Sequence, residues 1–167
     1  DLGPTVLSLL GIEPPDYMDG KAFAGKYKQM EGRDYIIGSA DRFDEQADMR
    51  RSVIDGRFVY VRNFLPQLPY SIRISYREQI PMNKILLEKG ARGELSGAPA
   101  YIHSRTKPLE ELYDLQSDPY EVNNLASNPA YSNKITEMRK VLADWQLQVG
   151  DKGFIPEHDL IRMFWPG

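Results

Sequence analysis

The 167-residue chain contains no cysteine, and this absence removes several kinds of site at once. Disulfide bonds, thiolate nucleophiles and cysteine-based zinc centres are all excluded. Histidine is nearly as scarce, since only His103 and His158 occur and no metal-binding pair spacing exists. The sequence also lacks a Gly-x-Ser-x-Gly nucleophile motif, a phosphate-binding glycine loop and a dinucleotide fingerprint. We therefore expect no self-sufficient catalytic site and no metal site in this chain.

Long apolar runs and a strong charge of one sign are missing as well. No run approaches the roughly 18 apolar residues that a membrane span needs. The formal net charge is −3, with acidic and basic residues interspersed, whereas phosphate backbones are bound by clustered positive charge. We therefore expect neither a membrane span nor a nucleic-acid partner. The length suits one ordinary domain with a sizeable core.

Two helices are predicted with clear ends. Residues 2–10 carry Val6, Leu7, Leu9 and Leu10 after Asp1, a candidate N-cap, and Gly11 follows them. That surface is too apolar for an exposed helix, so we expect it to pack against a larger body, and the chain looks cut at a helix start. The second helix runs from Pro129 to residue 149, with Asn128 as its cap and Gly150 as its end. Its apolar residues recur every three or four positions, which indicates one core-facing side.

Strand patterns occupy much of the chain between these helices. Residues 33–38 read as one strand, and residues 51–54 and 58–61 read as two more, joined at Asp55-Gly56 by a hairpin turn of type I′. A further strand covers residues 112–115. Strands in series with a late amphipathic helix predict an α+β fold.

The remaining connections are expected to be less regular. The prolines of residues 64–70 exclude a central strand there. Residues 80–87 suggest a helix that is interrupted near Pro81, and residues 91–107 read as a long polar loop. The apolar tail at residues 154–156 and 160–165 is expected to dock on the protein, since it would otherwise lie exposed to water.

One charge-dense stretch, residues 39–50, is the candidate for a binding role. Its carboxylates could hold a hard cation, but the spacing is not that of an EF-hand loop and arginines lie among them. A solvated, salt-bridged loop is the plainer interpretation. The third interpretation is substrate recognition, because the planar fork of arginine suits sulfate or carboxylate groups on an acidic sugar. The candidate substrate-binding residues are Arg42, Asp44, Arg50 and Arg51.

Three segments, in order, resemble the sulfatases. The first is Asp1-Leu2-Gly3-Pro4-Thr5-Val6 with Leu10-Gly11-Ile12, and the second is Met18-Asp19-Gly20-Lys21-Ala22-Phe23. The third and most specific runs from Glu110 to Ala126 and contains Glu111-Leu112-Tyr113-Asp114-Leu115, Asp118-Pro119 and Asn124-Leu125-Ala126. The resemblance implies the C-terminal part of such an enzyme, within the alkaline-phosphatase superfamily.

The resemblance implies a particular fold, a division into domains and a place for the catalytic groups. The fold would be a small four-stranded antiparallel sheet with a long C-terminal helix packed on it. Residues 1–32 would be the end of the catalytic α/β domain and a linker, and residues 33–167 the C-terminal subdomain. Formylglycine and calcium would belong to the preceding catalytic domain, which would be the partner of this chain. No catalytic residue is carried over, so the chain alone is expected to be inactive.

Shorter matches, among them Arg51-Ser52-Val53 and Leu142-Ala143-Asp144-Trp145, are similar to the heparan N-sulfatase (N-sulfoglucosamine sulfohydrolase) branch. This implies a sulfate ester or sulfamate on a glycan as substrate, as in glycosaminoglycan degradation. Two other functions remain open: a phosphatase or phosphodiesterase of the same superfamily, and a stand-alone glycan-binding module. An exposed apolar patch on residues 2–10 would favour a domain interface over a stand-alone module. We expect a bacterial protein of the periplasm or the exterior.

Overall fold

The computed structural model describes residues 1–165. They form two compact units, the first from Asp1 to Asp34 and the second from Tyr35 onward. Each unit is described by itself. None of the helices in the described part combines the length and the apolar content needed to cross a membrane.

The first unit contains helix α1, Leu2–Leu9. Asp1 precedes it as predicted, but its carboxylate does not cap the helix. Asp1 Oδ1 instead accepts hydrogen bonds from Lys21 N at 2.7 Å and from Arg33 Nη2 at 3.0 Å. The side chain is therefore used to hold residues 20–33 beside the helix start, and the predicted cap is wrong in this respect.

The buried side of α1 is its polar side. Thr5 and Ser8 are buried, and their hydroxyl oxygens accept from Phe23 N at 3.1 Å and Tyr27 N at 2.8 Å. The large apolar side chains lie outward, with exposed fractions between 52% and 74% for Leu2, Val6, Leu9, Leu10 and Ile12. Within the first unit this apolar surface is uncovered.

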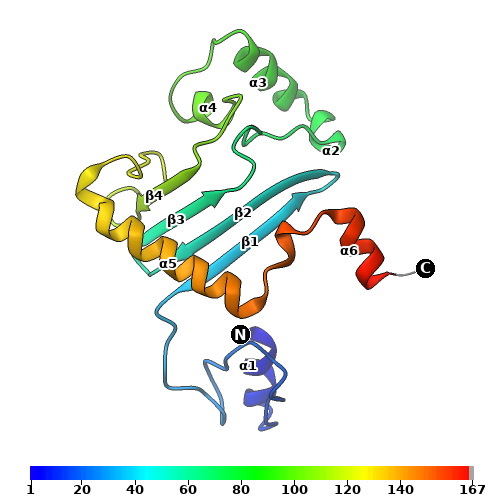
Figure 1. Ribbon diagram of the computed structural model, residues 1–167, viewed down its shortest axis with the longest axis vertical. Coiled ribbons are helices and arrows are strands. Elements are labelled where there is room, and N and C mark those ends of the chain that lie inside the picture. Colours follow the sequence, from blue (N-terminus) through cyan, green and yellow to red (C-terminus); the bar gives the residue numbers. More distant parts are fainter. Residues whose placement is uncertain (166–167) are drawn as a thin grey trace. The chain divides into compact units, whose positions relative to one another are not determined.

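The second unit is built on a four-stranded antiparallel sheet in the order β1-β2-β3-β4. Its strands are β1 (Ile36–Phe43), β2 (Gln46–Ile54), β3 (Phe58–Asn63) and β4 (Glu110–Asp114). Helix α5, Ser132–Val149, lies across one face of this sheet (Figure 1). The predicted fold class, a four-stranded antiparallel sheet with a long helix packed on it, is confirmed.

The core lies between the sheet and α5. Strands β2, β3 and β4 contribute Val53, Tyr60 and Leu112 to the buried core. Helix α5 contributes Ile135, Met138 and Leu142, which are spaced three and four residues apart. Asn128 Oδ1 accepts from Ala130 N at 3.0 Å at the 3-10 turn η1, Pro129–Tyr131, which leads into α5. Gly150 ends the helix with φ of 58°, a left-handed conformation that suits glycine. The predicted C-terminal end is confirmed, whereas at the N-terminal end Pro129 begins the 3-10 turn and α5 itself begins at Ser132.

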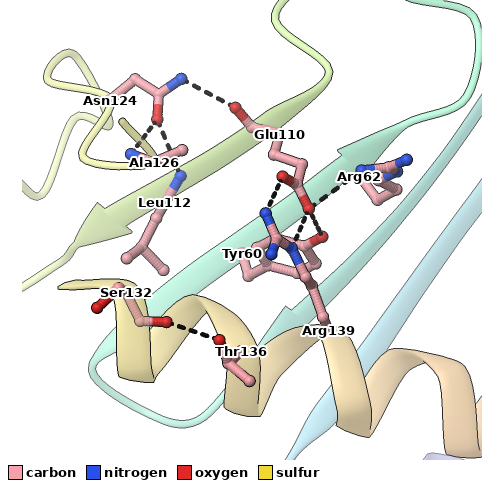
Figure 2. Close-up of polar contacts among 9 residues, drawn as sticks. All are labelled: Tyr60, Arg62, Glu110, Leu112, Asn124, Ala126, Ser132, Thr136 and Arg139. Atoms are coloured by element: carbon pink, nitrogen blue, oxygen red, sulfur yellow. Dashed lines mark hydrogen bonds and ion pairs between the residues drawn. The ribbon is translucent and has the colours of Figure 1, made fainter. Parts of the chain in front are cut away.

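A polar cluster ties α5 to two strands beside the core. Glu110 Oε1 accepts from Tyr60 Oη and from Arg139 Nε, each at 2.6 Å, and forms an ion pair with Arg62 at 3.1 Å (Figure 2). The Arg139 guanidinium lowers the pKa of Glu110 to about 2, against the opposing effect of burial. The carboxylate thus stays ionised and joins β3, β4 and α5.

The segment that most resembles sulfatases, Glu110–Ala126, is structural in this unit. Asn124 Oδ1 accepts from Leu112 N at 3.1 Å and from Ala126 N at 2.9 Å, and its amide donates to Glu110 O at 3.1 Å (Figure 2). These bonds satisfy the outer edge of β4, which no further strand covers. Residues 121–126 form neither helix nor strand, and the chain continues from them into η1 and α5.

The charge-dense stretch is not a loop, and this prediction is wrong. Residues 39–50 belong to the hairpin of β1 and β2, which turns at Asp44. β1 is an edge strand with mostly exposed or half-exposed residues, a position where charged side chains are tolerated because they remain in water. The polar sequence of β1 therefore gave no strand signal, because the buried apolar residue of this hairpin's core, Val53, lies on β2.

Two other connections differ from expectation in detail. At the Asp55-Gly56 turn φ is positive at Gly56 (89°) but not at Arg57, a pattern of type II′ and not of type I′. Asp55 Oδ1 also accepts from Arg57 N at 3.0 Å and Phe58 N at 2.6 Å, which holds the turn. The hairpin itself and its antiparallel pairing are confirmed.

The segment between β3 and β4 contains three helices: α2 (Ser75–Glu78), α3 (Pro81–Ala91) and α4 (Gly97–Ile102). Pro81 begins α3 and does not interrupt it, since proline suits the first helical position. The predicted loop at 91–107 is wrong where α4 lies. After α5 come a 3-10 turn, η2 (Lys152–Phe154), and α6 (Glu157–Phe164). The Phe154 ring packs on the Phe64 ring at 5.0 Å, while the apolar residues of α6 stay largely exposed.

Candidate functional site

The four candidate residues do not form one cluster, because strand alternation divides them. Arg51 points to the α5 face of the sheet, together with Val53, while Arg50 points to the opposite face. Arg42 pairs with Ala47 beyond an irregularity in β1, and Asp44 lies at the hairpin tip. Each of the four is therefore described where it lies.

Arg51 is buried, with 1% of its side chain exposed. Its Nε and Nη2 donate to the two carboxylate oxygens of Asp151 at 2.9 and 2.8 Å, and Nη2 also lies 2.8 Å from Asp41 Oδ1. Nη1 donates to Ala40 O and Arg50 O. The guanidinium thus joins both strands of the hairpin to the end of α5, and its donors are engaged within the protein.

Arg42 and Asp44 support the hairpin turn. Asp44 has φ of 55°, a left-handed conformation that aspartate tolerates. Arg42 donates to Asp44 O at 3.4 Å and to Glu45 O at 3.2 Å, and also pairs with Glu157 of α6. These side chains are largely exposed, and Arg42 lies beside a shallow, mostly apolar hollow in front of α6.

Arg50 lies on the other face, next to a buried charge pair. Its Nε is 3.1 Å from Asp48 Oδ2, while Asp48 Oδ1 accepts from Lys107 Nζ. Asp48 and Lys107 are almost completely buried, and the Arg50 side chain is 35% exposed. The pair holds the segment before β4 against β2, and it fixes the position of Arg50. The two Nη groups of Arg50 have no partner within residues 1–165.

Arg50 forms part of the wall of a cavity of about 260 Å³. Glu111 and Tyr113 of β4 line it, and Tyr70 and Tyr101 from the segment before β4 cover it. Val61, which pairs with Glu111, also contributes to the wall. Three tyrosines, one carboxylate and one arginine therefore meet on the sheet face opposite α5.

The hydroxyl groups in this cavity are ordered around Glu111. Glu111 Oε2 accepts from the hydroxyls of Tyr113 and Tyr101, and Oε1 accepts from Asn63 Nδ2 at 2.6 Å. The Tyr70 and Tyr101 hydroxyls lie 2.9 Å apart. Burial first, and these hydrogen bonds second, raise the pKa of Tyr70 and of Tyr113 well above the ordinary value for tyrosine. The phenols therefore stay protonated.

The mouth of the cavity is formed by the turn after β4. Tyr120, 87% exposed, and Glu121 both line it. Glu121 has φ of 54°, in the left-handed region that a glutamate rarely adopts. Burial, followed by the nearby charge of Glu111, raises the pKa of Glu121. Strained backbone residues cluster at ligand-binding and active sites, so this rim is a candidate binding region.

Sequence reasoning found Arg50 but missed the rest of this cavity. Its tyrosines and glutamates lie in the Glu110–Asp114 strand, in the proline-bearing segment 64–70, in the predicted loop 91–107 and in the turn after the strand. Only the fold joins these segments. The signal available was the alternation of Glu111 and Tyr113 with the core residue Leu112. That pattern shows two polar-tipped side chains on the face opposite the core.

The groups expected in a sulfatase do not fit this chain. Within the described residues, no three carboxylate or histidine side chains gather to hold a metal ion. No residue set of the type that yields formylglycine occurs in the sequence either. The arrangement can bind and orient a ligand.

Comparisons with known proteins match the chain along its whole length. An ulvan-active sulfatase of Formosa agariphila is 46% identical over 167 residues, which is 100% of this chain and 28% of that protein. The human N-sulphoglucosamine sulphohydrolase is 27% identical over 165 residues, covering 90% of this chain and 32% of that protein. The chain thus spans less than a third of these relatives. No protein-family model matches it.

Solved structures agree on the fold. A 2-O GAG sulfatase has a TM-score of 0.59 at 23% identity, covering 91% of this chain and 25% of that one. A putative sulfatase from Bacteroides thetaiotaomicron has a TM-score of 0.58 at 24% identity, with the same coverage of 91% and 25%. A third structure, solved with its substrate D-glucosamine-2-N,6-O-disulfate, has a TM-score of 0.57 at 15% identity, with coverage of 93% and 25%.

The sequence match and the shared fold agree with the sulfatase motifs in the chain. The chain is homologous to sulfatases, and it matches the C-terminal portion of such a protein.

Proposed function

We propose that this chain is the substrate-facing C-terminal portion of an enzyme that hydrolyses sulfate groups on a glycan. The observation that carries the proposal is the 46% identity to an ulvan-active sulfatase over all 167 residues. Identity at this level, spread over the whole chain, goes with shared architecture and usually with related chemistry. The proposal concerns the whole protein, because the chain itself offers a binding cavity and no nucleophile.

The residues present in this chain indicate which parts of the active site must lie in another domain. We place the nucleophile, as formylglycine, and calcium in a catalytic domain that precedes Asp1. We assign residues 1–32 to the end of that domain and its linker, and residues 33–167 to the C-terminal subdomain. The outward apolar side chains of α1, such as Leu9 and Leu10, support this assignment, because a helix at a domain interface needs such a face.

The substrate class is narrowed by the two curated relatives. The ulvan-active sulfatase is the more similar of the two, and the human sulphohydrolase is more distant. We therefore propose a sulfate ester on an ulvan-like polysaccharide as the first candidate, and a sulfamate of a glycosaminoglycan as the second. A phosphatase or phosphodiesterase is not favoured, since the curated relatives named above are a sulfatase and a sulphohydrolase. We place the protein in the bacterial periplasm or exterior, in keeping with its lack of cysteine.

The test uses the full-length protein, expressed with its upstream sequence. Free sulfate is measured after incubation with ulvan, with heparan sulfate and with an aryl phosphate. Release from ulvan is expected, with none from the 167-residue chain alone. Phosphate release without sulfate release would overturn the proposal, and so would sulfate turnover by the purified chain alone.

A further inference from the structure

The cavity between Arg50 and Tyr120 has a hydrogen-bonding character that selects among ligands. The Tyr113 and Tyr101 hydroxyls donate to Glu111, so the Tyr70 hydroxyl donates to Tyr101 in the 2.9 Å contact between them. Two hydroxyl protons are therefore directed at the buried carboxylate, and the third is directed at the Tyr101 oxygen. What these oxygens still offer to a ligand is acceptor lone pairs.

The charged side chains that line the cavity also favour a ligand that donates hydrogen bonds. Glu111 and Glu121 contribute two carboxylates, and Arg50 contributes the one guanidinium among the described lining residues. Sulfate and carboxylate groups accept hydrogen bonds and cannot donate them, so they would find only the Arg50 Nη groups as partners. They would also meet the two like charges. A ligand that donates hydrogen bonds and carries no charge avoids both costs.

Size and shape limit the ligand further. The volume of about 260 Å³ lies just below the range of roughly 300–1,000 Å³ for sites that hold drug-sized ligands. One ring with its substituents is a suitable occupant, and a longer chain is not. Tyr120 is 87% exposed at the rim, where the apolar body of its ring can cover the flat face of a bound ring.

We propose that this cavity binds one uncharged, hydroxyl-bearing sugar residue of the glycan, with its hydroxyls donating to the tyrosine oxygens and to Glu121. Arg50 donates through Nη to a ring or hydroxyl oxygen of that residue, while its Nε stays on Asp48. Tyr120 covers the ring from the solvent side. The inference rests on the proposed function, because a sulfated polysaccharide is the ligand that would present such a residue.

The test measures binding by the 167-residue chain itself. Backbone amide spectra are recorded while methyl glucoside, methyl xyloside and methyl rhamnoside are added in the millimolar range. The expected result is a saturable shift of resonances around Tyr101, Tyr113 and Tyr120 with at least one of these sugars. Tyr120→Ala and Arg50→Gln should each weaken that binding about tenfold, which corresponds to roughly 1.4 kcal/mol.

A matched control is available in the first unit. Tyr17 is 85% exposed, close to the 87% of Tyr120, so Tyr17→Ala removes an equally accessible ring from another place. It should leave sugar binding unchanged. Thermal unfolding of each variant shows whether the fold is intact. Tyr120 is 87% exposed, so Tyr120→Ala should melt near the wild-type temperature. Arg50→Gln loses the ion pair with Asp48, so its sugar binding is measured at a temperature where its unfolding curve shows the folded state.

Three outcomes would overturn the proposal. The first is no shift with any of the uncharged sugars. The second is an equal shift with sodium sulfate or glucuronate, which would make the cavity an anion site. The third is tighter binding of glucosamine, whose ammonium would then be the recognised group. None of these depends on sulfate release, so failure of this inference and failure of the proposed function are separate results.

Discussion

Lys107 and Asp48 form an ion pair in which the two side chains are 0% and 1% exposed. The pair joins the end of the segment before β4 to strand β2, across 59 positions of sequence. It also lies directly beneath Arg50, whose Nε contacts the second oxygen of Asp48 at 3.1 Å. One buried pair therefore positions both the cover of the tyrosine cavity and the arginine in its wall.

Replacement of one member of this pair should be costly. Lys107→Met leaves the Asp48 carboxylate buried with only Arg50 beside it, and removal of one partner from a buried ion pair typically costs about 3–5 kcal/mol. Urea unfolding measures the loss. Lys140→Met is the matched control, because Lys140 pairs with Asp144 at the surface, and such exposed pairs contribute about 0.5 kcal/mol or less. Equal losses in the two variants would contradict the structural role assigned to Lys107.

Acid should destabilise the second unit over a defined pH range. Hydrogen bonds from Arg51 lower the pKa of Asp151 to about 2, and Arg139 does the same for Glu110. Because the folded-state pKa lies below the unfolded one, each carboxylate contributes its full stabilisation above the unfolded value and loses it as pH falls toward 2. The free energy of unfolding should drop by on the order of 2 kcal/mol per carboxylate between about pH 5 and pH 2.

Urea titrations at a series of pH values measure this loss. The Asp151→Asn variant provides the comparison, since it no longer titrates at that position. Its stability should be lower at neutral pH and should depend less on pH. A pH dependence identical to that of the wild-type chain would show that Asp151 does not contribute.

Replacing Asn124 by alanine should lower the free energy of unfolding more than replacing Asn123. Asn124→Ala removes the acceptor of Leu112 N and Ala126 N, and two backbone donors at the edge of β4 then lose their partner. We expect a loss of about 1–3 kcal/mol in the free energy of unfolding. Asn123→Ala is the control, since its side chain is exposed. Faster amide exchange at Leu112 in the Asn124 variant alone would identify the cause as the lost edge bonds.

Met138 lies at the centre of the contact between α5 and the sheet, with 0% exposure. Met138→Ala should leave a cavity beside Leu112 and Tyr60 and destabilise the chain by about 2–5 kcal/mol. Leu147→Ala, on the same helix but 84% exposed, should change stability by less than about 0.5 kcal/mol. Thermal and urea unfolding of both variants check the difference. A small effect at Met138 would mean that the helix packs on the sheet more loosely than described.

Local chemistry was sufficient to predict the C-terminal end of α5 and one of the two hairpins. Gly150 acts through the backbone beside it, so its sequence position marks the end of α5, while Asn128 and Pro129 mark the 3-10 turn that leads into the helix. The apolar spacing of Ile135, Met138 and Leu142 likewise predicted the buried side. The first hairpin was missed because its strand β1 lies at an edge and faces water. Its charged residues carry no strand signal until the position of β2 is known.

The sequence by itself determined the α+β class, the long helix with its buried side, and the motifs shared with sulfatases, since all of these depend on short-range spacing. The tertiary structure decided which polar side chains meet. Arg50 and Arg51 are neighbours in sequence, yet alternation along β2 sends one to the tyrosine cavity and the other to Asp151. Tyr70, Tyr101 and Glu111 come from separate segments, and only the pairing of β3 with β4 and the Lys107 anchor bring them to one cavity.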